Sequence, residues 1–458
     1  MDDTATSVTP AAGAIRATGN ATPDADPEAG ARPTALLPVT QLLRISAYWL
    51  GLTAIDAAVG LFVTNRLEFD HLVPQDDVGK SMFMISIAAA IVGIIIQPTV
   101  GAISDYTVSR WGRRKPYIVF GSLLDVVFLL GIAMGNSVLM LAAFMLLLSV
   151  STNIARGPFQ GYVPDLVAEP QVGMASGMVG LMQVVGNVTG FMLVALSVTL
   201  GVMPLSLVAV ALVELVTMAS VVLKVGRGMP PKPRRGRSWS TIAREAWATD
   251  ILQERSYVWL LVSRLLFLIA GSLIVNFVLI YLGRAYGMSK AEANSMYVAV
   301  LIVVVATSVL AILPASRLSD RIGRKPLIFA ACAGGALGAA IIALTPSIPV
   351  ALVGAALFGS ANGSFLAVDW ALMTDIIPRA SAGRYMGMSN VATGSAGPLS
   401  LAIGGIVLDL VASAGSFPLS PRVVFIVAVA LFATAAVTLR PVIEPRGNAR
   451  PKPEAAAA

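Results

Sequence analysis

Gly101–Pro116 reads GAISDYTVSRWGRRKP, and a shorter copy, LSDRIGRKP, returns at Leu318–Pro326. Each copy lies between two long apolar runs. A charged signature that recurs at the same place in two hydrophobic halves is typical of membrane proteins built by duplication. Three residues beyond the basic loops also recur 210 positions later: Asp165 as Asp375, Gly173 as Gly383, and Gly177 as Gly387.

The composition points to the same class of protein. Of the 458 residues, 56% are hydrophobic and only 12% are charged, whereas a soluble protein carries about 25% charged residues. The net charge of +7 comes from short loops between apolar runs, which is typical of membrane topology and not of a nucleic-acid-binding face. With Cys332 and His71 as the single cysteine and histidine, we expect no metal site, no cofactor and no enzymatic centre.

Twelve apolar runs are long enough to cross a bilayer, and backbone groups in lipid must be satisfied within each segment. We therefore predict an all-α integral membrane protein. The expected spans are 42–65, 81–103, 117–135, 138–157, 173–199, 203–224, 257–283, 293–315, 326–346, 348–374, 385–412 and 421–440.

A polar, basic segment divides the spans six and six. The predicted regions are a disordered tail (1–38), a six-helix bundle (39–225), a central loop (226–256), a second bundle (257–442) and a short tail (443–458). Lys and Arg concentrate in alternate loops, so we expect both tails and the central loop to face the cytoplasm at the cell membrane. Within the central loop, Trp239–Gln253 mixes apolar and charged residues, which suits a helix on the membrane surface.

Two parallel six-helix repeats around a long loop resemble the layout of the major facilitator superfamily. The resemblance implies twelve helices in two bundles, a substrate site between them near mid-membrane, and a monomer in the lipid bilayer.

A narrower resemblance lies around the fourth span. Asn153–Val167, which contains Arg-Gly-Pro-Phe-Gln and Pro-Asp-Leu-Val, is similar to the sugar symporters of that superfamily, the sucrose transporters and the glycoside–pentoside–hexuronide group. The spacing within the first basic loop, Val368–Asp375 and Ser263–Arg264 also resemble that branch. This implies a sugar or glycoside as substrate and a cation, a proton in the first place, as coupling ion.

The chain departs from the sucrose-transporter pattern at two positions. Where that pattern has an aspartate in the fourth span and an arginine after the Gly-Pro pair, this sequence has Ser149 and Gln160. The resemblance therefore does not supply a carboxylate in the fourth span to carry the proton. In the second basic loop, Ser316 stands where a glycine is expected.

The basic loops are candidates for conformational gating. Gly101 would let two helices approach closely, and Asp105 can pair with an Arg or cap a helix N-terminus. Pairs between helix ends can hold one state of a two-state cycle and release it in the other. The alternative is that the cations only set the topology. The predicted gating set is Gly101, Asp105, Arg110, Gly112, Arg113, Arg114, Asp165, Asp320, Arg321, Gly323, Arg324 and Asp375.

Ionisable residues inside apolar spans are costly and usually functional. Asp56 lies in the middle of the first span, which suits proton binding or hydrogen bonding to sugar hydroxyls. Asp125 in the third span is the second candidate. Arg264 in the seventh span can supply the positive partner, although it lies near enough to the span's start to reach the interface. The alternative for Asp56 is a purely structural ion pair.

Amides and one aromatic ring extend the candidate substrate site. Gln183 and Asn187 are four residues apart and share a helix face, and amides donate and accept hydrogen bonds as sugar hydroxyls do. The alternative is hydrogen bonding between helices. The predicted substrate and coupling set is Asp56, Asp125, Asn153, Arg156, Gln160, Gln183, Asn187, Arg264, Asn276, Asn362, Asp369 and Trp370.

The sequence thus predicts a secondary transporter that couples a small polar solute to a cation by alternating access. Two alternatives stay open. One is a proton-driven exporter of drugs or metabolites, and the other is a transporter-like sensor or scaffold whose central loop is the working part.

Overall fold

The computed structural model describes residues 35–168, 171–228, 230–245, 247, 254–376, 382–414 and 420–443. Most of the two predicted tails lies outside these residues, as do the side chains of Asp320, Trp370 and Asp375. The elements in order are α1 (Val39–Glu68), η1 (Gln75–Asp77), α2 (Val78–Asp105), α3 (Lys115–Ala133), α4 (Val138–Gln160), α5 (Tyr162–Leu166), α6 (Val172–Thr199), α7 (Leu205–Lys224), α8 (Trp239–Glu245), α9 (Arg255–Tyr286), α10 (Lys290–Ile322), α11 (Arg324–Leu344), α12 (Ile348–Ile376), α13 (Ala382–Ser413) and α14 (Ser420–Leu439).

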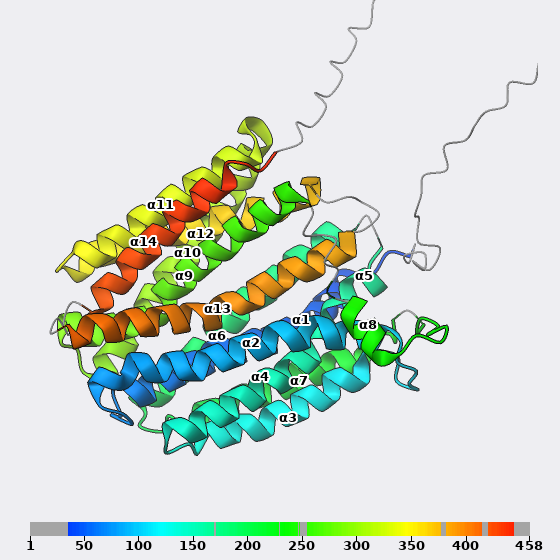
Figure 1. Ribbon diagram of the computed structural model, residues 1–458, viewed down its shortest axis with the longest axis horizontal. Coiled ribbons are helices and arrows are strands. Elements are labelled where there is room, and N and C mark those ends of the chain that lie inside the picture. Colours follow the sequence, from blue (N-terminus) through cyan, green and yellow to red (C-terminus); the bar gives the residue numbers. More distant parts are fainter. Residues whose placement is uncertain are drawn as a thin grey trace, which may run out of the picture. The chain divides into compact units, whose positions relative to one another are not determined.

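The predicted all-α class is confirmed. Twelve of the described helices are long and apolar enough to cross a membrane, and each coincides with one predicted span (Figure 1). Several helices run a few residues beyond the apolar run, because polar residues can continue a helix outside the hydrocarbon layer. The described residues contain no β-strand.

The long helices pack in two sets. In the first set α1 contacts α6 and α7, α2 contacts α4, and α3 contacts α4 and α7. In the second set α9 contacts α13 and α14, α10 contacts α12, and α11 contacts α12 and α14. The largest contacts between the sets are those of α2 with α13 and of α6 with α10.

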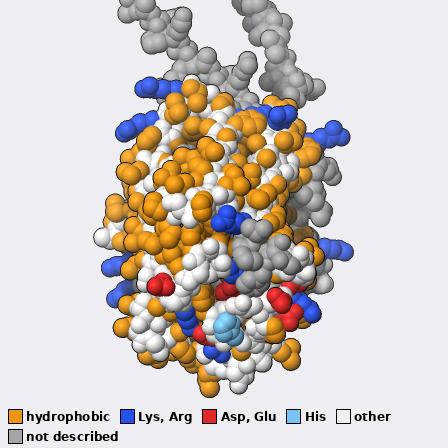
Figure 2. Space-filling model, turned by 90° about the vertical axis from the view of Figure 1, so that its left-hand side faces the viewer, with side chains coloured by type: hydrophobic (Ala, Val, Ile, Leu, Met, Phe, Trp, Pro, Cys, Tyr) orange, Lys and Arg blue, Asp and Glu red, His pale blue; other side chains and the backbone are white. Residues whose placement is uncertain are grey.

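Apolar side chains cover much of the outside, as lipid contact requires. On α7, Leu212, Val216 and Leu223 are 58%, 69% and 76% exposed, while Glu214 on the opposite side is fully buried. Figure 2 shows hydrophobic side chains spread over one face of the molecule, with acidic side chains confined to its lower part. A polar interior beneath an apolar exterior is the arrangement expected of a transmembrane bundle.

The first part of the predicted surface helix is present. Helix α8 covers the first seven residues of the predicted stretch, and 248–253 lie outside the described residues. The helix packs against α2, and Ile242 is 2% exposed. Its apolar side is thus covered by protein, while Trp239 stays 43% exposed.

The repeated basic loops contain glycines that the backbone requires. Gly112 has φ +99° and Gly323 has φ +96°, in a region that side-chain-bearing residues rarely adopt. Both precede the Arg-Lys-Pro that begins the next helix, α3 or α11. Each copy of the basic motif thus has a glycine with positive φ shortly before or directly at the start of the helix that follows.

Gly157 allows α2 and α4 to cross closely. A Cβ atom at Gly157 would lie 2.4 Å from the backbone oxygen of Gln97 and 3.2 Å from the backbone nitrogen of Gly101. Both clashes involve backbone, so only a shift of a whole helix could relieve them. The sequence assigned the close approach to Gly101, and the structure shows that its partner is the glycine of the Gly-Pro pair.

We expect Gly157→Ala to destabilise the folded protein by about 1–3 kcal/mol, the usual cost of overpacking. Thermal unfolding of the detergent-purified protein measures the change. Gly180→Ala on α6 is the matched control, because a Cβ there meets no atom within 4 Å. Equal unfolding temperatures for the two variants would show that the α2–α4 crossing tolerates a methyl group.

Candidate functional site

Asp56, near the middle of α1, and Arg156, in the last part of α4, form an ion pair. Arg156 Nη2 donates to Asp56 Oδ2 at 2.5 Å, joining α1 to α4. The Asp56 side chain is 50% exposed although its neighbours Ile55 and Ala57 are buried, whereas Arg156 is 8% exposed. Two thirds of the apolar span of α1 is buried, a larger share than in most of the other spanning helices.

The pair has polar neighbours on the same face of α4. Asn153 and Gln160 lie three residues before and four after Arg156, which places all three on one side of that helix. Asn153 is 8% exposed, and its amide donates to the backbone oxygen of Ser149 at 2.8 Å. Gln160 is half-buried at the helix end.

The suggested pairing of Arg264 with the carboxylate of α1 is wrong. Arg264 is 4% exposed and pairs with Asp369 of α12, and its Nη2 donates to Thr393 Oγ1 at 3.0 Å. The second set of helices therefore contains its own buried ion pair. Asp56 instead obtains its cation from α4, where Arg156 lies one residue before Gly157.

The predicted amides differ in their surroundings. Asn276 on α9 donates to Ser400 Oγ on α13 at 2.9 Å, which matches the alternative of hydrogen bonding between helices. Asn187 is exposed on α6, and Gln183, one turn earlier, is half-buried. Asn362 on α12 is half-buried.

Asp125 does not face an open space, contrary to the expectation for a substrate site. Its side chain is completely buried between α3 and α4, where Ser151 and Thr152 donate to its Oδ1. Glu214 on α7, also completely buried, lies within hydrogen-bonding reach of it. Glu214 is not in the predicted set, although the signal that identified Asp56, a carboxylate inside an apolar span, applies to it equally.

Gln97 on α2 is a second residue that the sequence analysis missed. It is 4% exposed, and its Nε2 has no hydrogen-bond partner among the described residues. A Cβ at Gly394 of α13 would lie 3.2 Å from its Oε1, so Gln97 lies at the α2–α13 contact between the two sets. A buried amide with a spare donor between the sets is a candidate for solute binding. In the sequence, a Gln-Pro pair inside an apolar span was the feature that could have identified this residue.

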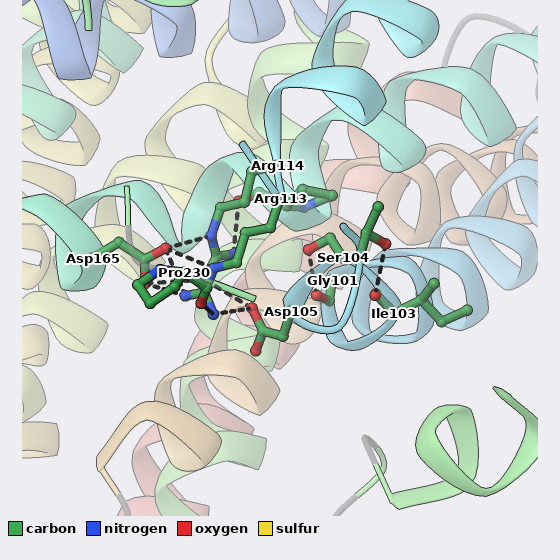
Figure 3. A network of polar contacts seen from close by, with 10 residues as sticks. Gly101, Ile103, Ser104, Asp105, Arg113, Arg114, Asp165 and Pro230 are labelled. Atoms are coloured by element: carbon green, nitrogen blue, oxygen red, sulfur yellow. Dashed lines mark hydrogen bonds and ion pairs between the residues drawn. The ribbon is translucent and has the colours of Figure 1, made fainter. Parts of the chain in front are cut away.

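Four of the predicted gating residues, Asp105, Arg113, Arg114 and Asp165, form a compact charged cluster (Figure 3). Asp165 accepts from Arg113 Nη2 at 2.7 Å and from Arg114 Nε at 2.8 Å. Asp105 Oδ1 lies 3.0 Å from Arg114 Nη2 and 3.7 Å from Arg113 Nη1. Burial acts to lower the pKa of Arg114, but Asp105 and Asp165 beside it raise the value above the ordinary one. Two cations and two anions thus balance at the ends of α2, α3 and α5.

Basic residues of both loops also cap helix ends, so topology is not their only role. Lys115 Nζ donates to the backbone oxygens of Val222 and Val225 at the end of α7. In the second loop Lys325 Nζ donates to those of Arg440 and Val442 at the end of α14, 2.7 Å in both cases. Cations near a helix C-terminus satisfy carbonyls that lack intrahelical partners.

The arginines of the two loops also have matching contacts. Arg114 Nη1 donates to the backbone oxygen of Pro158 on α4, and Arg324 Nη1 to that of Ala371 on α12. Arg110 is exposed above the ring of Trp111, and Arg321 is exposed in the last turn of α10.

At the opposite end of the helices, polar contacts join the two sets. The amides of Asn65 and Asn294 donate to each other, at 2.8 and 3.2 Å. Arg284 Nη2 lies 2.7 Å from Glu68 Oε2, with both side chains almost completely buried, and Lys290 Nζ lies 2.6 Å from an oxygen of Asp70. We call this the acidic-loop end. Here α1 is tied to the end of α9 and the start of α10.

Backbones also meet closely near the acidic-loop end. A Cβ at Gly79 of α2 would lie 2.1 Å from the backbone oxygen of Gly405 of α13. The two sets are therefore in direct backbone contact at this end, and the ion pairs above seal the same region.

Comparison with known proteins adds family information to this geometry. Residues 45–400 and 259–457 match the family model described as Major Facilitator Superfamily. A 126-residue stretch is 36% identical to the general alpha-glucoside permease of Schizosaccharomyces pombe, covering 24% of this chain and 23% of that protein. A 124-residue stretch is 29% identical to sucrose transport protein SUC3 of Arabidopsis thaliana, covering 22% and 21%. The matches thus span less than a quarter of these relatives' lengths.

Solved structures share the fold over most of the chain. The crystal structure of nucleoside transporter NupG has a TM-score of 0.63 at 14% identity, covering 88% of this chain and all of that one. The D-xylose-proton symporter has a TM-score of 0.64 at 17% identity, covering 90% and 99%. At these identities the likeness shows the fold alone.

We expect Asp165→Asn to destabilise the protein by about 3–5 kcal/mol, because it leaves two buried guanidinium groups without their main anion. Asp105→Asn should cost less, since Asp105 is 25% exposed and is farther from Arg113. Chemical or thermal unfolding of the purified variants measures both. A larger loss from Asp105→Asn would reverse the order that the distances predict.

We expect Arg284→Gln to open the acidic-loop end, because breaking a buried pair costs about 3–5 kcal/mol and a shift of 1.4 kcal/mol already changes an equilibrium about tenfold. The opening is measured by the reactivity of a cysteine introduced by Gly60→Cys, because position 60 lies one turn beyond Asp56 on α1. The native Cys332 is buried and should not react. Labelling by an impermeant thiol reagent from the acidic-loop side of sealed vesicles should increase.

Arg66→Gln is the matched control for that opening. Its pair with Asp70 is about a quarter exposed, and such surface pairs are worth roughly 0–1 kcal/mol. Labelling that rises equally in both variants would mean that the buried pair with Glu68 does not hold this end closed.

Proposed function

Because this chain belongs to the major facilitator superfamily, we propose that it is a secondary active transporter that moves a small polar solute by alternating access, coupled to proton symport. The regions 39–225 and 257–442 are proposed as the two moving bundles. The observation that carries the proposal is the Asp56–Arg156 pair, a half-exposed carboxylate at mid-span beside a buried guanidinium.

A sugar or glycoside is the proposed substrate class. In its support, the chain has stretches similar to proteins named as an alpha-glucoside permease and a sucrose transport protein. Arg156, Asn153 and the spare donor of Gln97 are suited to hydroxyl-rich solutes, because guanidinium and amide groups donate several hydrogen bonds in fixed directions.

Asp56 is the proposed proton carrier. While ionised, it holds Arg156 in an ion pair at 2.5 Å; once protonated, it releases a guanidinium that can turn to a solute hydroxyl. Proton and solute would then favour the same state of the transporter, which is what couples them. Ser149, where related sugar symporters have a carboxylate, donates to the backbone oxygen of Ala89 on α2 at 2.7 Å and so joins two helices.

We propose that the structure represents the state closed at the acidic-loop end, with the basic-loop end facing the cytoplasm. The contacts among Asn65, Asn294, Glu68 and Arg284 support the closed end, and the distribution of Lys and Arg supports the orientation. Both termini would then be cytoplasmic, in a monomer at the cell membrane.

The proposal predicts that one member of a panel of sugars and glycosides causes alkalinisation outside lightly buffered, energy-depleted cells that express the protein. We expect Asp56→Asn to reduce this signal to background while retaining exchange of labelled sugar across the membrane, because the amide cannot carry the proton. The measurements are the external pH and the sugar counterflow.

Asp76→Asn is the control, since Asp76 is exposed in η1 and remote from the pair. Alkalinisation that survives Asp56→Asn would exclude Asp56 as the carrier. A lack of response to every sugar, together with lowered accumulation of an unrelated dye, would contradict sugar symport and favour the exporter.

A further inference from the structure

Asp125 and Glu214 form a buried carboxyl pair behind the Asp56–Arg156 site. Asp125 comes from α3 and Glu214 from α7, and both side chains are 0% exposed. The two carboxyl groups lie within hydrogen-bonding reach of each other. No role in solute binding follows from their position, because neither is accessible from an open space.

The hydrogen bonds around the pair leave one donor missing. Asp125 Oδ1 accepts from Ser151 Oγ and from Thr152 Oγ1, the latter at 3.0 Å. Glu214 Oε1 accepts from the hydroxyl of Tyr48 at 3.2 Å, and Ser122 Oγ lies 2.5 Å from that hydroxyl. The other two oxygens, Asp125 Oδ2 and Glu214 Oε2, are fully buried and have no hydrogen-bond partner in the part of the chain that the structure describes.

The charged groups near the pair do not neutralise two carboxylates. Arg156 of α4 is close enough to attract Asp125, but it is bonded to Asp56. From α1 the titratable neighbour is Tyr48, and α6, which also contacts α7, contains no titratable side chain. Two ionised carboxylates in contact and out of water, with one shared cation at hand, would be strongly unfavourable.

We infer that Asp125 and Glu214 form a proton-binding site that holds a single proton between Asp125 Oδ2 and Glu214 Oε2. One residue is then the carboxylic acid and donates to the other, a carboxylate, and the pair has one negative charge in total. This assignment accounts for both oxygens that lack a protein donor, and it does not depend on what the protein transports.

The shared proton links four helices of the first set. It joins α3 to α7, Tyr48 ties the pair to α1, and Ser151 and Thr152 tie it to α4, five and four residues before Arg156. If the proposed function holds, the pair also keeps one negative charge behind Arg156 when Asp56 is protonated. The guanidinium would then keep an anionic neighbour throughout the cycle.

Infrared spectroscopy of the purified protein in lipid tests this site, because only a protonated carboxyl gives a carboxylic-acid carbonyl band. We expect the band at neutral pH in the wild-type protein. Asp125→Asn and Glu214→Gln should each abolish it, since the new amide supplies the missing donor and leaves the remaining carboxyl ionised. Both variants preserve shape and hydrogen bonding, so both should fold.

Two controls separate this site from the others. Asp56→Asn and Glu68→Gln should leave the band unchanged, because Asp56 and Glu68 are paired with arginines. A wild-type protein without the band overturns the inference and needs no variant. A band that keeps part of its intensity in each single variant also overturns it, because that means two separately protonated acids and no shared proton. Neither result involves transport, so failure of sugar symport leaves the test intact.

Discussion

The interior of this protein depends on one electrostatic constraint: a charge removed from water must meet a compensating group within hydrogen-bonding distance. Asp56 meets Arg156, Arg264 meets Asp369, and Glu68 meets Arg284, each across a boundary between helices. Because the partner is on another helix in each case, these pairs tie together helices that otherwise pack little against each other. The apolar exterior supplies no such specificity, since lipid and leucine are nearly equivalent surroundings.

The basic loops apply the same constraint to the backbone. The last four carbonyls of each helix lack partners within the helix, and near a membrane they need donors from elsewhere. Lys115 and Lys325 supply those donors to the last helix of each set. The basic motif, which in the sequence looks like a topology signal, is therefore also a set of helix caps. A glycine with positive φ precedes the capping lysine in both copies.

Much of the fold could be predicted from the sequence, because hydrophobic length alone determines a membrane helix. The pairing of charges could not, since any of several cations was compatible with Asp56 until the α1–α4 packing was known. Asn276 illustrates the same limit: its type suits a sugar, but its position next to Ser400 makes it a link between helices. Glu214 differs from both, because it could have been predicted: like Asp56, it is a carboxylate inside an apolar span, in this case the sixth.

The lysine caps have a mechanical consequence. Lys115 joins the start of α3 to the end of α7, and Lys325 joins the start of α11 to the end of α14, so the third and sixth long helices of each set are tied together at the basic-loop end. The sets touch through close backbone contact at the other end, where Gly79 meets Gly405. In the proposed transport cycle, each set then tilts as a unit, because its helices are joined at the basic-loop end. Since α2 is about 42 Å long, a small change in its tilt at one end moves its other end by a much larger distance.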